Sequence, residues 1–188
     1  KELRKQARRA VELFIQEILD HSENREWING QEDREKLSRD LWHEGLVTVY
    51  RLLAILKLES SDDPARSFSF ASTSLWRNSY SPGLVLARFA HDVLERGVET
   101  GAFLETGLRS LFRMFEVGLS SPELVVKPLG GGLFGEHVTP VLSRLAWGER
   151  AVAHLLDQLL WTTPLRKGGT RERVHYGPLD VEDLGRVY

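Results

Sequence analysis

Leu41 to Leu58 reads LWHEGLVTVYRLLAILKL, and this stretch decides the fold. When it is wound as a helix, apolar residues occur on nearly every side, which is typical of a helix enclosed by its neighbours. It therefore predicts the central helix of the core, in a helical segment that begins near Glu32. Arg51 lies inside this run, and Glu59 lies on a similar face about two turns later. A structural ion pair, or an arginine with a buried stem and a satisfied head, is favoured here over a binding site.

Helical periods of apolar residues also occur on both sides of this stretch. They cover residues 1–21, 84–98, 103–117 and 139–145, and the residues between Gly148 and Pro164. Residues 124–126 are apolar and β-branched, and are expected to be extended. We predict an all-α fold, an orthogonal bundle of about six to seven helices with one long loop pinned by aromatic side chains and with short extended segments.

The composition is that of an ordinary globular domain. The 188 residues carry a formal net charge of -2 and contain no cysteine. This charge argues against a strongly basic nucleic-acid module but leaves a local basic face open, and the missing thiols exclude disulfides and thiolate metal sites. No apolar run approaches the length of about 20 residues that spans a bilayer. We expect a cytoplasmic protein that has no membrane partner.

The predicted long loop is the connection from residue 60 to residue 82, which differs in texture from the helices. It is rich in serine, and larger side chains are spaced through it: Phe68, Phe70, Leu75, Trp76 and Tyr80. The simpler interpretation is a surface loop held down by its aromatic residues. The alternative is a loop that faces a partner or DNA, because long irregular connections in compact domains are commonly functional.

Two basic segments are candidates for contact with the DNA backbone. The first is the start of the first helix, with Lys5, Arg8 and Arg9, and the second is a glycine-containing loop near the end, with Arg166, Lys167, Arg171 and Arg173. Lysine and arginine side chains neutralise phosphates, and glycines let a backbone approach a ligand closely. The plainer alternatives are a solvated helix face for the first segment and an exposed flexible linker for the second.

No pattern in the sequence points to catalysis. The run GGGLFG at 130–135 lacks the spacing of nucleotide-binding glycine motifs, so we expect its glycines to act sterically and Leu133-Phe134 to anchor in the core. The histidines do not occur in pairs at a metal-ligand spacing, and no nucleophile motif is present. The sequence therefore predicts no catalytic, cofactor-binding or metal-binding residue in this chain.

The last residues, 173–188, read RVHYGPLDVEDLGRVY. Val174, Tyr176 and Leu179 alternate with other residues as in an extended segment, and Asp180 is then a natural N-cap for an amphipathic helix. The chain stops after about two turns of that helix. We therefore expect the chain to be a piece of a larger protein.

A set of short motifs occurs in a characteristic order over residues 45–188. The set comprises VYRLL at 49–53 with Glu59, YS at 80–81, LRSLFRMFEVG at 108–118, GGLF at 131–134 and YGPLDVEDLGRVY at 176–188. Together they resemble the helical region that precedes the methyltransferase domain in type IIG restriction-modification methylases and in related phage-defence adenine methyltransferases, such as those of BREX and DISARM systems. The residues that carry the match are Arg51, Glu59, Gly131, Gly132, Leu133, Phe134, Tyr176, Leu184, Gly185 and Tyr188.

Two departures from the family pattern stand out. His175 occurs where an acidic residue is common, and Gly130 occurs where the family often has asparagine. The family's later motifs, the glycine motif for S-adenosylmethionine and the N-P-P-Y catalytic motif, lie beyond the end of this sequence. The resemblance thus implies a fragment that holds no cofactor and transfers no methyl group, while its parent protein binds S-adenosylmethionine and is a DNA adenine-N6 methyltransferase, with or without a fused endonuclease.

The resemblance also implies a domain organisation. Residues 1–21 would be an N-terminal amphipathic helix or a connector from an upstream domain, residues 32–172 a helical scaffold domain, and residues 173–188 the start of the joint to a methyltransferase domain. The expected role is that of a non-catalytic spacer that positions DNA. Its partners would be double-stranded DNA through the parent protein, the methyltransferase domain of the same chain, and other subunits of a defence system. The alternative is a self-contained helical adaptor that binds another protein and has no link to methylation.

Overall fold

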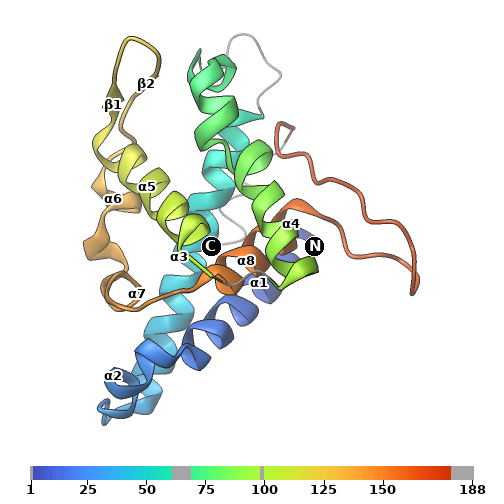
Figure 1. Cartoon of the computed structure of the whole chain (residues 1–188). Helices are drawn as coiled ribbons and strands as arrows, with labels where there is room; N and C mark the ends of the chain where they lie inside the picture. The colour runs from blue at the N-terminus through green and yellow to red at the C-terminus, as the bar shows by residue number, and fades with distance from the viewer. Residues whose placement is uncertain (1, 61–68, 98–99, 179–188) are drawn as a thin grey trace.

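The computed structural model describes residues 2–60, 69–97 and 100–178, and it confirms the all-α prediction. The described α-helices are α1 (Glu2–Asp20), α2 (Arg25–Asn29), α3 (Arg34–Glu59), α4 (Ala87–Arg96), α5 (Phe103–Val117), α6 (Gly131–Phe134), α7 (Pro140–Arg144) and α8 (Glu149–Leu160). The strands β1 (Leu119–Ser120) and β2 (Val125–Val126) form one small antiparallel hairpin, with Leu119 paired to Val126. Figure 1 shows the helices crossing at steep angles, as in the predicted orthogonal bundle.

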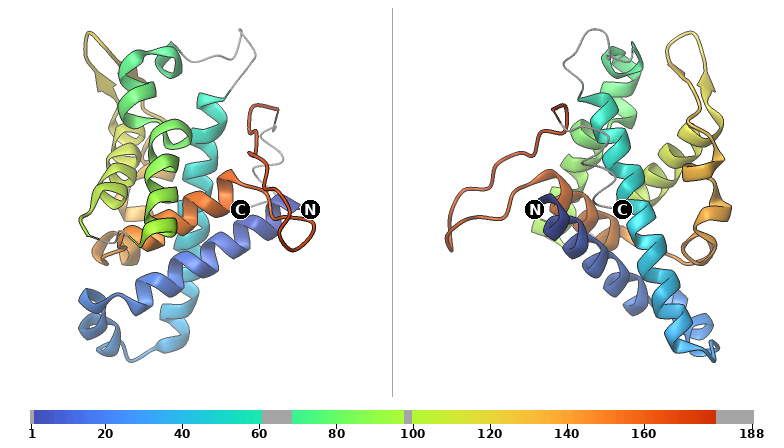
Figure 2. Two further views of the ribbon diagram at one scale, coloured as in Figure 1. Left: turned by 45° about the vertical axis from the view of Figure 1, so that its right-hand side comes forward. Right: turned by 180° about the vertical axis from the view of Figure 1, so that it is seen from behind.

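Helix α3 is the long central helix that its apolar run predicts. It begins at the N-cap Asp33, whose side chain accepts a hydrogen bond from the Lys36 backbone N–H at 2.9 Å. It runs through the whole molecule in both views of Figure 2, and most of its residues between Leu41 and Leu56 are buried. Gly45 lets α1 approach closely, because a Cβ atom at this position would lie 2.8 Å from Val11 Cγ1.

Helices α1 and α8 lie side by side, although they stand at opposite ends of the sequence (Figure 2). The α1 residues Ala10, Val11 and Phe14 have no exposed surface and belong to the same core cluster as α3 and α8. Gln6 Nε2 also donates to the Trp161 carbonyl at 3.2 Å. The predicted N-terminal helix is therefore an integral part of the core, and a further role as a connector stays a prediction.

The connection from residue 60 to residue 82 is more regular than the sequence suggests. Residues 61–68, which include Phe68, lie outside the described part of the chain. Beyond them come a 3₁₀ turn (Ser69–Ser72) and two π-helical turns, Trp76–Tyr80 and Pro82–Leu86, which lead directly into α4. The expectation of irregular structure is therefore wrong for this part.

Aromatic anchoring of this connection is confirmed. Phe70 and Trp76 are buried and pack edge to face, with ring centroids 4.7 Å apart. Both rings also contact Phe115 of α5, at centroid distances of 5.8 and 6.0 Å. Such edge-to-face pairs are a favoured aromatic geometry. The connection is thereby held against the core by a three-ring cluster.

Helices α5 and α8 meet at their N-termini through a reciprocal exchange of carboxylates. Glu149, in the first turn of α8, accepts hydrogen bonds from the Leu104 and Glu105 backbone N–H groups of α5 at 3.0 and 3.2 Å. Glu105 in turn accepts from the Trp147 and Gly148 backbone N–H groups at 2.7 and 3.4 Å. Each carboxylate satisfies N–H groups that a helix start leaves without a partner, and each faces the positive end of the other helix.

Candidate functional site

Arg51 is the centre of the first cluster of motif residues. Its guanidinium donates to the Leu133 carbonyl at 2.6 Å, to the Gly135 carbonyl at 2.9 Å and to Thr139 Oγ1 at 3.3 Å. The group also lies over the Phe112 ring, 5.2 Å from its centroid. Burial disfavours the charged form and lowers the pKa of Arg51 to about 10.

The GGLF segment is therefore bound to the central helix through Arg51. Gly131 to Phe134 forms the single turn α6, Phe134 is buried as predicted, and Gly132 is exposed. Of the two alternatives that the sequence favours for Arg51, the ion pair with Glu59 is wrong, and the arginine with a buried stem and a satisfied head is confirmed. Backbone carbonyls replace the expected carboxylate, and Glu59 binds other groups at the far end of α3.

Glu59 is the centre of the second cluster, at the C-terminal end of α3. Its carboxylate accepts hydrogen bonds from Trp76 Nε1 at 3.0 Å, from the Gly83 backbone N–H at 2.9 Å and from the Ser81 hydroxyl. Burial raises the pKa of Glu59, while these donors and the nearby Arg173 act in the opposite direction. The tight fit is visible at Gly83, where a Cβ atom would lie 2.6 Å from Glu59 Oε1.

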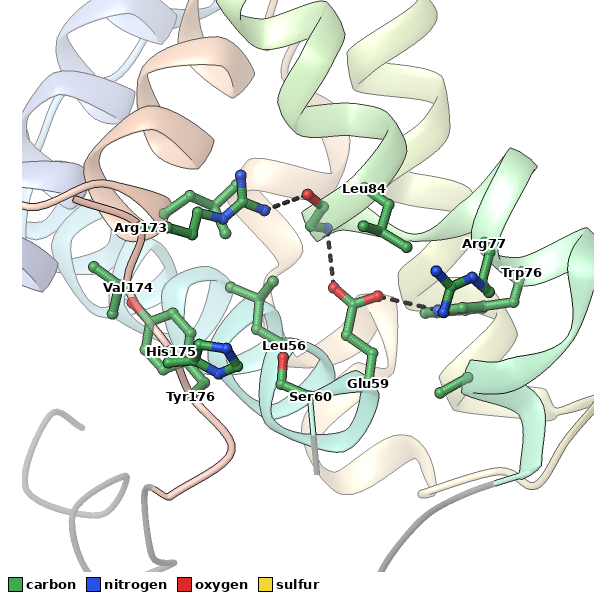
Figure 3. A pocket seen from close by; sticks show the side chains of 13 residues that line it. Leu56, Glu59, Ser60, Trp76, Arg77, Leu84, Arg173, Val174, His175 and Tyr176 are labelled. Carbon is green, nitrogen blue, oxygen red and sulfur yellow. Dashed lines mark hydrogen bonds between the residues drawn. The ribbon is translucent and has the colours of Figure 1, made fainter. Parts of the chain in front are cut away.

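A pocket of about 330 Å³ opens beside this cluster (Figure 3). Glu59 and Trp76 line one side, and Arg173 and His175 line the other, and Gly83 also belongs to the lining. The Arg173 guanidinium donates to the Gly83 carbonyl and stacks on Trp161, 5.3 Å from the ring centroid. Residues 173–176, here called the return segment, thus lie across the pocket from the end of α3 and the turn at residue 83.

Tyr176 fixes this return segment to α8. Its side chain is buried, and its hydroxyl donates to the Leu159 carbonyl, while burial raises the pKa of the phenol. One residue later, the Gly177 carbonyl accepts from Lys57 Nζ at 3.4 Å. The motif residues Leu184, Gly185 and Tyr188 lie outside the described residues.

The first basic segment forms an exposed surface on α1. Its residues Lys5, Arg8 and Arg9 are all exposed. Arg9 pairs with Glu12 at 3.4 Å, and Arg8 lies 6.0 Å from the centroid of the Trp42 ring. Exposed ion pairs of this kind contribute little to stability.

The second basic segment is divided by the structure into fixed and exposed residues. Arg171 binds Asp157 through two nitrogen–oxygen contacts of 2.9 and 3.1 Å, and also donates to the Thr162 carbonyl at 3.0 Å. Arg173 is held at the pocket described above. Arg166 and Lys167 are exposed at the tip of the loop, and neither side chain has a hydrogen bond or ion pair with any described residue.

The two basic segments lie at the same end of the molecule. Glu2 of α1 lines a shared hollow with residues 162–166, 169–170 and 172 of the loop, and both views in Figure 2 place the loop beside the N-terminus. The sequence gives no sign of this juxtaposition, because the segments are separated by almost the whole chain. The contact of α1 with α8 brings them together.

Buried carboxylates are the polar groups that sequence reasoning missed. Besides the buried Glu149 and the half-buried Glu105, the buried Glu44 of α3 accepts from the Val141 and Leu142 backbone N–H groups at 3.1 and 2.7 Å, at the start of α7. Burial raises the pKa of Glu44. A glutamate within an apolar helical run is the sequence signal for such a role, but the run does not reveal the partner.

An apolar groove lies between α1, α2 and α3. It has a volume of about 700 Å³ and an apolar floor formed by Ile15, Leu19, Ile28, Leu37, Leu41 and Trp42. Arg34, Arg39 and Glu12 stand at its polar positions. Leu19 remains 37% exposed, so this floor is only partly covered by the protein's own side chains.

Comparison of the chain with protein-family models, with curated proteins and with solved structures finds no match. Among residues 2–60, 69–97 and 100–178, His, Cys, Asp and Glu side chains form no group of three or more that could hold a metal ion. None of the helices in these ranges combines the length and the apolar character that crossing a bilayer requires.

Proposed function

We propose that this chain is the non-catalytic helical spacer and DNA-positioning region of an S-adenosylmethionine-dependent DNA adenine-N6 methyltransferase from a restriction-modification or phage-defence system. Its parent is a larger cytoplasmic protein, and the methyl donor binds in the methyltransferase domain that follows Tyr188. Double-stranded DNA is the partner of the parent, and other defence-system subunits are candidates for further contacts. The fragment itself supplies scaffold and orientation.

One observation carries this proposal: motif residues that stand far apart in the sequence contact one another in the fold. Arg51 donates to the Leu133 carbonyl of the GGLF segment. Glu59 accepts from Ser81 of the YS motif, and the pocket beside it is lined by Tyr176. Motifs that resemble a family in their order along the chain thus also form two connected clusters around α3, as expected of parts of one scaffold.

The location of the exposed cations supports a DNA-facing end. Lys5, Arg8 and Arg9 are exposed in the first half of α1, and Glu2 at the start of this helix lines the same hollow as Arg166 of the loop. Exposed cations of both segments are thus available in a chain whose formal net charge is -2, alongside the carboxylates Glu2 and Glu172 of the hollow. Local clustering of this kind attracts phosphates even where the whole domain is not basic.

The proposal is tested on the full-length protein that contains this chain. Its reading frame beyond Tyr188 is expected to encode the glycine motif and N-P-P-Y, and the purified protein is expected to transfer labelled methyl groups from S-adenosylmethionine to adenine in duplex DNA. Alanine in place of the catalytic N-P-P-Y asparagine is the control for background. A reading frame that stops soon after Tyr188, or a protein that neither binds nor methylates duplex DNA, would refute the proposal.

The second candidate function is a self-contained helical adaptor that binds another protein. The observation in its favour is the groove between α1, α2 and α3, whose apolar floor is partly exposed. A protein that carries no methyltransferase motifs, and whose cellular partner is lost when Leu19 is replaced by aspartate, would support the adaptor over the spacer.

A further inference from the structure

Residues 161–174 form an arm that projects from the helices (Figure 1). Its base is a short antiparallel ladder, in which the Thr162 N–H donates to the Glu172 carbonyl at 2.8 Å and the Val174 N–H donates to the Leu160 carbonyl at 2.9 Å. Trp161 and Arg173 form the bridge between these two bonds. The base is thus continuous with the end of α8.

Two arginines lock the base of this arm. Arg171 grips Asp157 of α8 with both terminal nitrogens, and Arg173 stacks on Trp161 while donating to the Gly83 carbonyl. A planar guanidinium that makes paired contacts holds its partner in a defined orientation. The arm therefore leaves α8 at a set angle, and these two arginines are unavailable for a ligand.

The tip of the arm is a defined turn, although its glycines suggest a flexible linker. The Gly169 N–H donates to the Arg166 carbonyl at 2.9 Å, and Gly168 has a φ of 79°. A positive φ at the third position of a four-residue turn is the mark of a type II turn and favours glycine. A Cβ atom at Gly169 would lie 3.0 Å from the Arg166 carbonyl oxygen. The turn thus favours both glycines and presents the residues before it in one arrangement.

The turn presents an apolar side chain next to two cations. Leu165 is fully exposed and follows Pro164, while Arg166 and Lys167 come directly after it. A single exposed leucine on a flat surface needs no explanation. Here it stands at the end of a braced projection, where it can enter a narrow groove and leave the two cations beside it free to reach the walls.

We propose that this arm is a DNA wedge: Leu165 enters the minor groove and unstacks a base step, while Arg166 and Lys167 bind the phosphates on either side. This inference rests on the proposed DNA-positioning function and assigns the arm a defined contact within it. Proteins that bend DNA through the minor groove insert apolar side chains between base steps and hold the strands with neighbouring basic residues. Lys5, Arg8 and Arg9 at the same end extend the phosphate-binding surface.

The test measures binding of the full-length protein to a fluorescein-labelled duplex over a range of salt concentrations. Leu165→Ala is expected to weaken binding about tenfold, the effect of losing most of a buried leucine side chain, without changing the salt dependence. The double variant Arg166→Gln/Lys167→Gln is expected to lower the slope of log K against log salt by about 2, since each phosphate contact contributes about 0.9.

A second readout distinguishes a wedge from a simple phosphate contact. A duplex that contains 2-aminopurine is expected to brighten when the wild-type protein unstacks the base, and to remain quenched with Leu165→Ala. A polyamide that occupies the minor groove is expected to compete with the wild-type protein. Leu129→Ala, which alters an exposed leucine near the β-hairpin, and Arg34→Gln, at the start of α3, are the matched controls and should bind as wild type.

Each alternative outcome leads to a different conclusion. If the full-length protein binds no DNA and methylates none, the proposed function and the wedge fail together. If it binds and methylates DNA but Leu165→Ala neither weakens binding nor alters 2-aminopurine fluorescence, the wedge fails and the positioning function stands. If Leu165 is instead required for binding to vesicles of anionic lipid and not to duplex DNA, the arm is a membrane contact and the wedge is overturned.

Discussion

Replacing Glu149 by alanine should destabilise the protein at the start of α5, because Glu149 accepts a hydrogen bond from Leu104, which lies 45 residues earlier in the chain. The Glu149 residue is 6% exposed, and its carboxylate accepts the Leu104 and Glu105 backbone N–H groups. Ala102, at the N-cap position of α5, provides no side-chain hydrogen bond. Glu149 thus takes the place of a local cap, and its removal leaves the start of α5 without an acceptor.

The size of the effect follows from two contributions. Loss of a helix N-cap, which leaves the buried Leu104 N–H without a partner, costs about 1 kcal/mol, and loss of a charge at a partly buried helix N-terminus costs up to about 1 kcal/mol more. The free energy of unfolding should therefore fall by about 2 kcal/mol, a substantial part of the stability of an ordinary domain.

Urea unfolding monitored by circular dichroism measures this loss. With a denaturant slope of about 2 kcal/mol per molar, the midpoint should move down by about 1 M. Glu123→Ala, which removes an exposed glutamate in the β-hairpin, is the matched control and should stay within about 0.5 kcal/mol of wild type. If Glu149→Ala unfolds with the control, then the exchange of carboxylates between α5 and α8 does not contribute to stability.

The packing around α3 leads to three further predictions. Gly45→Ala should lower the free energy of unfolding by about 1 to 3 kcal/mol in the same urea assay, because the new methyl group would press on Val11 at the crossing of α1 and α3; an unchanged midpoint would show that the helices can separate freely. Arg51→Lys should lower the free energy of unfolding by about 2 kcal/mol, because an ammonium group cannot reproduce the planar guanidinium that donates to both the Leu133 and the Gly135 carbonyls. Thermal unfolding equal to that of wild type would contradict this prediction. The pKa of Glu59 is higher in the folded protein than in the unfolded chain, so the pH dependence of stability contains a contribution from this group that is present below the unfolded pKa and is lost as pH rises through the folded pKa. Glu59→Gln should remove this pH-dependent contribution from the free energy of unfolding, measured in urea between about pH 4 and 7. Parallel pH profiles for the two proteins would count against it.

The central helix and the outline of the bundle can be predicted from the sequence, because helix burial depends on the spacing of apolar residues. Residues 41–58 contain the information that makes α3 central. The connection before α4 is wrongly predicted as an irregular loop, since its serine content outweighs a local signal. Ser81 accepts from the Leu84 N–H at 3.0 Å and Pro82 begins the next helical turn, which is the usual start of a helix.

The partners of buried polar side chains cannot be predicted in the same way. The sequence singles out Arg51 and Glu59, but the first binds backbone carbonyls and the second binds a tryptophan, a serine and a backbone amide. Every residue carries a carbonyl, so no sequence pattern marks the one that an arginine selects. The same holds for the second basic segment. By charge alone, Arg171 belongs with Arg166 and Lys167, and only the structure shows that Arg171 is bound to Asp157 while the other two are exposed.

The packing of α1 on α8 has a consequence for synthesis on the ribosome. The apolar stripe of α1 that contains Phe14 leaves the ribosome before α8, the helix that packs along it and that ends at Leu160. A nascent chain must therefore carry this stripe without its α8 partner until translation has passed Leu160. Such late closure of a long-range contact slows folding and exposes apolar surface to chaperones. Arrest of translation before residue 149 should consequently leave a protease-sensitive N-terminal helix that becomes protected once α8 has left the exit tunnel.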